Sequence, residues 1–302
     1  MSALNRRQIL KSGAACTAAA LLTPSAALAA ESQAPAQPNP APAGLAPTGR
    51  RNNIHQSVAR WCYKQIPLDD LCVAGAQMGL KGIDLLQPDE YEVPRRHGLV
   101  CSMGYADGGN IDKGLNRLEN HDAIEAGLRK NVPLAAKAGV PNVITFSGLR
   151  AGMTDWEGAR NSIIGLRRLR SLMEDNGVTL CMELLNSKKD HKDYMCDHTD
   201  WGVAVVGEIG SKNIKLLYDI YHMQIMEGDV IATIQANHPW IGHFHTGGVP
   251  GRHELDDTQE VNWAGVMHGI AATGFTGYVA HEFNPTKDPL TSLRQAVDLC
   301  DV

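Results

Sequence analysis

Four residues of the types that bind metal ions recur through the second half of the chain. They are Glu183 in "LCMELLN", Asp219 in "LLYDIYH", His245 in "GHFHTGG" and Glu282 in "VAHEFNP". Successive members lie 36, 26 and 37 residues apart, which is the length of one strand and one helix. A lone carboxylate at a strand end often only caps the next helix, but three carboxylates and one imidazole form a donor set for Mn²⁺, Mg²⁺ or Co²⁺. We therefore predict one divalent-metal site made by all four.

The chemistry expected of such a site is proton transfer beside a carbonyl group. A divalent cation can hold the oxygens of a 2-ketose or 2-keto acid and stabilise the enediolate that forms when a neighbouring carbon loses its proton. Glu183 and Glu282 would lie on opposite sides of that carbon, one removing the proton and the other returning it. Both glutamates are therefore predicted to be catalytic as well as metal-binding.

Four further polar residues are candidates for substrate contacts. His222 follows the aspartate of "YDIYH" by about one helical turn, and Asn186 follows the glutamate of "ELLN". Arg252 and His253 lie in the loop "TGGVPGRHELDD", where a guanidinium could bind a carboxylate or vicinal hydroxyls. The alternatives are a helix-start histidine with a backbone partner for His222, and an ordinary surface loop for Arg252 and His253.

Other residues near the strand ends are expected to shape the pocket or to pack in the core. Trp61, Lys64 and Tyr105 are predicted to wall the pocket. Cys181 and His243 each lie two residues before a predicted ligand, on the same face but one layer deeper. We expect Cys181 to pack in the core and His243 to be a buried, hydrogen-bonded histidine.

The elements that must position these residues begin near Ile54. From there, short apolar or β-branched runs alternate with longer segments of helical periodicity. Several helical segments end on glycine, namely Gly139, Gly177, Gly210 and Gly274. The helix after the second strand has the weakest pattern, because "PDEYEVPRRHG" is short and interrupted by proline. The eight expected strands are 57–62, 82–86, 100–105, 142–148, 179–185, 214–219, 241–247 and 277–283.

Eight strand–helix units in about 249 residues match the usual size of a (β/α)8 TIM barrel. We predict an α/β fold with a single barrel domain over residues 54–302. The active site of such a barrel lies at the carboxyl ends of the strands, which is where the predicted ligands fall. A doubly wound open sheet is disfavoured, because no glycine-rich phosphate loop follows the first strand.

The first 53 residues are expected to lie outside this domain. Residues 1–30 combine Arg6-Arg7, a short apolar stretch and a small-residue cleavage pattern, which predict a twin-arginine signal peptide and export to the periplasm. That stretch is short for a membrane span, so no stable membrane partner is expected, and the alternative is an uncleaved N-terminal anchor. Residues 31–53 are rich in Pro and Ala and are expected to form a disordered linker. The six cysteines left after signal removal show no CxxC spacing and predict single buried thiols.

The charge balance excludes some classes of partner. The net charge is -5, and Lys and Arg form no cluster beyond short pairs such as Arg95-Arg96. A nucleic-acid partner is therefore not expected. The expected partner is a small-molecule keto acid or ketose, and assembly as a homo-oligomer stays open.

Longer motifs resemble a known family. "ELLN", "YDIYHMQIMEGD", "GRHELDDTQE" and "HEF" resemble the hydroxypyruvate isomerase branch of the xylose isomerase-like barrel superfamily, and "HQSVARWCYKQIPLDDLC" resembles its first strand–helix unit. The resemblance covers about residues 54–302 and implies interconversion of hydroxypyruvate and tartronate semialdehyde. By motif, it implies metal ligands at Glu183, Asp219, His245 and Glu282, and substrate contacts from His222 and Arg252.

Two features of this chain favour other substrates. Members of that branch often have Gln where this chain has His245, a choice more like that of the ketose epimerases, and they are cytoplasmic. A ketose 3-epimerase or a keto-glycoside lyase acting on a periplasmic sugar is therefore a second hypothesis. An exported, non-catalytic sugar-binding barrel is a third.

Overall fold

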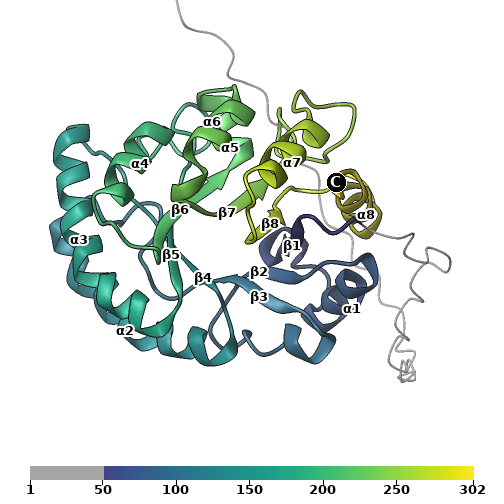
Figure 1. Cartoon of the computed structure of the whole chain (residues 1–302), viewed down its shortest axis with the longest axis horizontal. Coiled ribbons are helices and arrows are strands. Elements are labelled where there is room, and N and C mark those ends of the chain that lie inside the picture. The colour runs from purple at the N-terminus through teal and green to yellow at the C-terminus, as the bar shows by residue number, and fades with distance from the viewer. Residues whose placement is uncertain (1–50) are drawn as a thin grey trace, which may run out of the picture. The chain divides into compact units, whose positions relative to one another are not determined.

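The structure, a computed structural model, describes residues 51–302. The predicted signal peptide, and the predicted linker up to residue 50, lie outside the described residues. Eight parallel strands close into a barrel in chain order, and the last pairs with the first (Figure 1). The predicted TIM barrel is thereby confirmed. The strands are β1 His55–Ala59, β2 Gly82–Leu86, β3 Val100–Gly104, β4 Asn142–Thr145, β5 Thr179–Glu183, β6 Ile214–Asp219, β7 Ile241–Thr246 and β8 Tyr278–His281.

An outer ring of α-helices surrounds the strands (Figure 1). Strands and helices share a continuous apolar core, since parallel strands covered by helices are buried on both faces. Gly139 and Gly177, with φ of 72° and 63°, end two of the helices as predicted. Gly210 and Gly274 also have positive φ but lie just beyond the cap residues of their helices. The helices are α1 Leu68–Met78, α2 His121–Ala138, α3 Asp155–Asn176, α4 Thr199–Gly207, α5 Ile220–Met226, α6 Val230–Asn237, α7 Trp263–Ala272 and α8 Pro289–Leu299.

Two connections differ from a regular strand–helix repeat. Between β2 and β3 the helical segment is only a 3-10 turn, Pro94–His97. This segment is short, and its proline lacks the N–H group that an α-helix extended from its amino side would need. Between β6 and β7, by contrast, the two short helices α5 and α6 share one connection.

Several predicted strands extend past the observed ones at their carboxyl ends. β4 ends three residues and β5 two residues before the predicted boundary. The chain leaves the sheet at these points because the following residues form the loops of the barrel mouth. Asp219 and His245 are register partners at the ends of β6 and β7. Glu183 is the last residue of β5, and Glu282 directly follows β8.

The chain enters the barrel beside its own C-terminus. The backbone N–H groups of Arg51 and Asn52 each donate to the Asp301 carboxylate over 3.0 Å. Asn53 Nδ2 donates to the carbonyl oxygen of Val302 over 2.7 Å. These contacts lie next to the amino end of β1, on the side of the barrel opposite to the mouth.

The six cysteines of the barrel are buried free thiols, as predicted. Burial raises the pKa of the Cys181 thiol. A buried, protonated thiol packs as a small apolar group, in keeping with the core role expected for Cys181. Among residues 51–302, no helix has both the length and the apolar character needed to cross a bilayer.

Candidate metal centre and active site

The four predicted metal ligands meet at the mouth of the barrel. Each offers a ligand atom, and these atoms lie within 4.8 Å of one another. All four side chains are buried. Carboxylates this close together repel one another unless a cation lies among them. The structure therefore assembles the predicted donor set, Glu183, Asp219, His245 and Glu282, and its role as a metal site stays a prediction.

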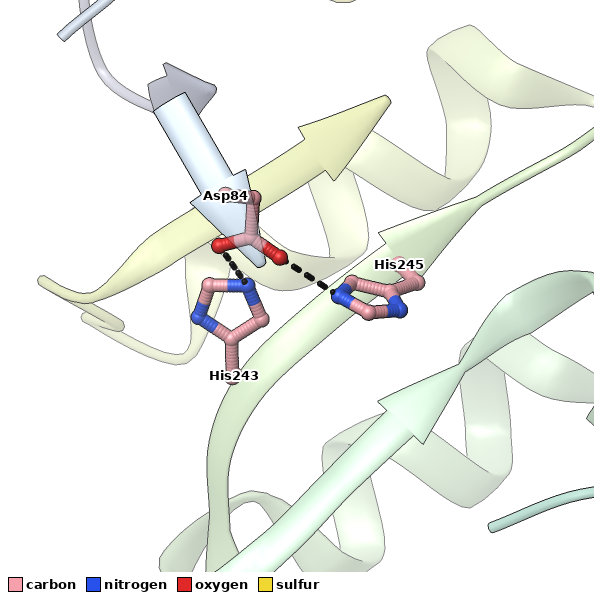
Figure 2. Close-up of side chains that lie close together, drawn as sticks. All are labelled: Asp84, His243 and His245. Carbon is pink, nitrogen blue, oxygen red and sulfur yellow. Dashed lines mark hydrogen bonds and ion pairs between the residues drawn. The ribbon is translucent and has the colours of Figure 1, made fainter. Parts of the chain in front are cut away.

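The imidazole ring of His245 lies between Asp84 on one side and the glutamates Glu183 and Glu282 on the other. Its Nε2 lies 2.9 Å from Asp84 Oδ2 (Figure 2). Its Nδ1 faces Glu282 Oε2 at 2.6 Å and Glu183 Oε1 at 3.5 Å. Within residues 51–302, this buried Nδ1 has no hydrogen bond of good geometry. The surrounding carboxylates outweigh burial and raise the pKa of His245, so without a metal Nδ1 also carries a proton. A divalent cation among the same oxygens would replace that proton, so these side chains fit a divalent metal.

Arg252 places a positive charge in the same cluster. Its Nη2 lies 2.9 Å from Asp219 Oδ2 and 2.5 Å from Glu282 Oε2. Its guanidinium carbon also lies 5.3 Å from the ring centroid of Trp61 and 5.2 Å from that of Tyr221, within cation–π range. Trp61 Nε1 in turn donates to Glu282 Oε1 over 2.5 Å. One guanidinium and one divalent cation would balance the three carboxylates of the donor set.

Burial and neighbouring charges shift the pKa values of the three carboxylates in different directions. Burial raises the pKa of Asp219 to about 7 and also raises the pKa of Glu183 above its ordinary value. Burial acts the same way on Glu282, but Arg252 and His245 outweigh it and hold the pKa of Glu282 well below the usual range. At neutral pH Glu282 is therefore ionised, and Glu183 is the readier of the two glutamates to take up a proton.

His222 is fully buried beside Asp219. Asp219 Oδ1 accepts a hydrogen bond from the backbone N–H of His222 over 3.2 Å, so Asp219 also caps α5. Asn186 Nδ2 donates to His222 Nδ1 over 2.6 Å, which leaves the Nε2 of His222 facing Asp219 Oδ2 at 3.5 Å. Burial lowers the pKa of His222, so its ring is neutral at neutral pH. Asn186 is fully buried and orients His222, and its predicted contact with substrate stays a prediction.

The loop after β7 turns Arg252 into the site and leaves His253 outside it. His253 is exposed, and its Nδ1 lies 3.0 Å from the carbonyl oxygen of Asn284. It does not line the cavity beside the carboxylates. The predicted substrate contact of His253 is therefore not supported, because its neighbour Arg252 takes the inward position.

Glu254 anchors the same loop to the start of α8. Its side chain is buried, and its carboxylate accepts four hydrogen bonds of 2.8 to 3.1 Å. The donors are the backbone N–H and hydroxyl of Thr286, the backbone N–H of Lys287 and the hydroxyl of Ser292. These bonds hold the pKa of Glu254 at about 2, against the opposing effect of burial. This anchor lies two residues after Arg252 in the same loop.

A cavity of about 360 Å³ adjoins the carboxylates. Trp61, Lys64 and Tyr105 line it, as predicted, together with apolar side chains from β4 and the following loop. Its volume lies at the small end of the range for small-molecule sites. His191 also lines the cavity and was not predicted, because it lies in the irregular segment "NSKKDHKD" without a periodic pattern. Its ring centroid lies 5.2 Å from that of His222.

Asp84 is a further site residue that the sequence analysis did not identify. Its fully buried carboxylate lies 3.1 Å from His243 Nε2 and 2.9 Å from His245 Nε2 (Figure 2). The hydroxyl of Ser102 donates to it over 2.6 Å. His243 is thus buried, as predicted, and Asn142 Nδ2 lies 3.5 Å from its Nδ1. Within residues 51–302, its Nε2 faces Asp84 but makes no hydrogen bond of good geometry. The sequence feature that could have indicated Asp84 is an aspartate within the apolar strand "GIDLL".

Two sequence profiles match the chain. The profile of the Xylose isomerase-like TIM barrel family matches residues 95–301, a range that contains the four predicted ligands. The profile of the twin-arginine translocation pathway signal sequence matches residues 3–23. The predicted export signal is thereby confirmed.

Individual proteins resemble the chain over most of their length. A 2-oxo-tetronate isomerase from Cupriavidus necator is 28% identical over 234 residues, covering 74% of this chain and 89% of the relative. A Xenopus laevis protein provisionally named hydroxypyruvate isomerase is 24% identical over 251 residues, covering 77% of this chain and 90% of the relative. The crystal structure of a 3-keto-D-glucoside 4-epimerase from E. coli superposes with a TM-score of 0.69 at 16% identity, covering 82% of this chain and 98% of that protein. At that identity, the structural similarity shows a shared fold.

Proposed function

Because this chain belongs to the xylose isomerase-like TIM barrel family, we propose that it is a metal-dependent isomerase of a small keto acid or ketose. The first assignment is an aldose–ketose type isomerisation of hydroxypyruvate to tartronate semialdehyde, in line with relatives named for 2-oxo-tetronate and hydroxypyruvate isomerisation. The observation that carries the proposal is the convergence of three carboxylates and one imidazole within 4.8 Å at the barrel mouth.

Those four side chains, Glu183, Asp219, His245 and Glu282, are proposed to hold Mn²⁺, Mg²⁺ or Co²⁺. When bound, the ion would supply positive charge that stabilises the enediolate oxygens. Arg252 adds a second positive charge through its contacts with Asp219 and Glu282. Such preorganised charge stabilises a developing oxyanion in a water-poor site without reorganisation during the reaction.

Glu183 is proposed to move the carbon-bound proton. It removes a proton from the carbon beside the carbonyl, and the electron pair of that C–H bond forms the carbon–carbon double bond of the enediolate. Glu183 then delivers a proton, either the same one or one exchanged with solvent, to the former carbonyl carbon, so the net reaction gains and loses no atom or electron. Its raised pKa suits it to both steps.

Glu282 is proposed to transfer the hydroxyl proton between the two substrate oxygens. Its ionised state at neutral pH, maintained by Arg252, lets it accept that proton from the substrate hydroxyl. Trp61 Nε1 fixes the other carboxylate oxygen of Glu282. In an epimerase, Glu282 would instead exchange a carbon-bound proton on the face opposite to Glu183.

A sugar outside the cytoplasm is the second candidate substrate, and the twin-arginine signal favours it. In this proposal residues 1–30 direct export to the periplasm, residues 31–53 form a linker, and residues 54–302 form the enzyme. The same side chains could epimerise a ketose at C3, or enolise a keto-glycoside and expel its aglycone. The non-enzymatic alternative is an exported sugar-binding barrel.

The test incubates each candidate substrate in D₂O with full-length protein loaded with Mn²⁺, Mg²⁺ or Co²⁺. The metal is then removed, and NMR detects the deuterium that has entered the substrate. Hydroxypyruvate, a panel of ketoses and a keto-glycoside are compared. Deuterium beside the carbonyl identifies the enolisable substrate, and a released aglycone identifies the lyase. Absence of exchange with every compound would exclude the isomerase, epimerase and lyase together.

Two variants separate catalysis from binding. Glu183→Gln and Glu282→Gln should each slow exchange by about 10²- to 10⁴-fold, the usual contribution of general acid–base catalysis. The matched control is Glu208→Gln, because Glu208 lies at the surface and pairs with Arg167. A binding barrel would show ligand affinity but no exchange in the wild-type protein.

A further inference from the structure

The proposed reaction leaves Asp84 and His243, two members of the cluster of Asp84, His243 and His245, without a role. The three side chains are fully buried in the barrel interior and come from β2 and β7 (Figure 2). His243 and His245 are two residues apart, so both point into the barrel. Only His245 reaches the four-residue donor set, while Asp84 lies on the far side of its ring.

We propose that Asp84 is a positioning residue, which in the metal-loaded protein holds His245 with its proton on Nε2 and so leaves Nδ1 as the nitrogen that binds the ion among Glu183, Asp219 and Glu282. This inference rests on the proposed metal centre and names a residue outside its donor set.

The direction of the hydrogen bonds follows from chemistry. A carboxylate has only acceptors, so an imidazole nitrogen that bonds to it must carry a proton. His245 Nε2 therefore donates to Asp84 Oδ2 over 2.9 Å. In the metal-loaded protein the ring is neutral, so the other nitrogen carries no proton and is the metal ligand. That nitrogen, Nδ1, is the atom directed at the donor set.

The surroundings keep Asp84 in this acceptor role. Ser102 Oγ donates to Asp84 Oδ1 over 2.6 Å, and His243 Nε2 lies 3.1 Å from the same oxygen. Asn142 Nδ2 lies 3.5 Å from His243 Nδ1, so an amide donor faces the ring nitrogen that carries no proton.

The backbone is also irregular at this point. The register between β2 and β3 shifts on both sides of Asp84, and Leu85 has a φ of 57°. Bulges near active sites change the direction of a side chain, and a left-handed leucine is an uncommon, strained conformation. The deformation coincides with the residue that contacts His245, in keeping with a positional role.

A competing interpretation is a second metal site made by Asp84, His243 and His245, which also lie close enough to share an ion. The hydrogen bonds argue against it. Ser102 already donates to one oxygen of Asp84 and His245 to the other. Zn²⁺ stoichiometry separates the two interpretations: one ion per chain supports positioning, and two ions overturn it.

The first experiment needs no variant. Long-range ¹H–¹⁵N NMR of the wild-type protein loaded with Zn²⁺, a diamagnetic probe, reports which ring nitrogen of His245 carries the proton, with His245→Gln used for assignment. A proton on Nε2 supports the proposal. A proton on Nδ1 overturns it.

The second experiment compares Asp84→Asn with Ser102→Ala. Ser102 contacts Asp84 but not His245, so its replacement disturbs the same buried network without removing the bond to His245. Loss of an outer hydrogen-bond partner usually weakens metal binding by about 10- to 100-fold. We expect that loss of Zn²⁺ affinity for Asp84→Asn, and a change of less than about threefold for Ser102→Ala. Equal affinities for Asp84→Asn and wild type would overturn the proposal.

Failure of the proposed function is distinguishable from failure of this inference. A wild-type protein that binds Zn²⁺ with Nε2–H on His245, but exchanges no substrate proton, contradicts the isomerase and supports the role of Asp84. Circular dichroism and thermal unfolding check that Asp84→Asn folds. If Asp84→Asn does not fold, the position of the ring proton on His245 in the wild-type protein still tests the proposal.

Discussion

The guanidinium of Arg252 lies 2.9 Å from Asp219 Oδ2, inside the donor set predicted to bind a metal. Its positive charge competes with a divalent ion for that oxygen and for Glu282 Oε2. We expect Arg252→Met to bind Mn²⁺ about tenfold more tightly, a change of about 1.4 kcal/mol, and to lose substrate exchange. Isothermal titration with Mn²⁺ measures the first effect.

Arg167→Met is the control for that variant, because Arg167 pairs with Glu208 at the surface. Weaker Mn²⁺ binding in Arg252→Met would mean that the guanidinium holds the ligands in place instead of competing with the ion.

Lys64 offers a way to tell a keto acid from a neutral sugar. It is exposed and lines the cavity beside the carboxylates. The positive charge of Lys64 would strengthen the binding of a substrate that carries a carboxylate, whereas it would not strengthen the binding of a neutral ketose. We expect Lys64→Gln to raise KM for hydroxypyruvate about tenfold, close to 1.4 kcal/mol, and to leave KM for a ketose unchanged. Lys137→Gln, on the surface of α2, is the control.

Metal stabilisation should depend on pH through Asp219. Burial raises its pKa to about 7, so protons compete with a metal for this carboxylate below neutral pH. The folded, metal-free protein prefers protonated Asp219, so this residue alone favours the folded state more as pH falls from 7 towards the ordinary value near 4. Added Mn²⁺ should therefore raise Tm more at about pH 8 than at about pH 5.5.

Thermal unfolding with and without Mn²⁺ at the two pH values measures this difference. Asp219→Asn should show a smaller increase in Tm, with a weaker dependence on pH. Equal increases for the wild type at both pH values would contradict the role of Asp219.

Glu254 should stabilise the loop that carries Arg252. Glu254→Gln replaces an acceptor oxygen by a donor that faces the hydroxyl and N–H groups of Thr286, Lys287 and Ser292. We expect the free energy of unfolding to fall by about 1–3 kcal/mol at neutral pH, measured by urea unfolding. Because the pKa of Glu254 is lowered to about 2, the difference from wild type should be constant above about pH 5 and narrow as pH falls from about 4.5 towards 2.

The barrel and its four candidate ligands could be predicted because each depends on local pattern. Strand–helix alternation indicates the fold, and the topology places every strand end at the same mouth. Glu183 and Asp219 are therefore neighbours as soon as the fold is known. The direction in which a polar side chain points beyond a strand end depends on contacts with residues distant in the sequence. Arg252, which points inward, and its exposed neighbour His253 show this.

Asp84 could not be predicted for a related reason. Its partner His245 lies 161 residues further along the chain, and the two meet only when the barrel has closed. Within "GIDLL" the aspartate is a single polar residue in an apolar strand, without periodic neighbours. Asn186 shows the same limit, since its amide contacts His222, which follows another strand, and the sequence did not predict that contact.

The contacts of Arg51 and Asn52 with Asp301 fix where the barrel can be tethered. Residue 51 is tied to the end of the chain, on the side away from the entrance to the cavity. A resin or surface coupled at residue 51 itself would lie on that rear side. Immobilised in this way, the protein would keep its entrance open to solution, and small molecules could reach the carboxylates without crossing the support.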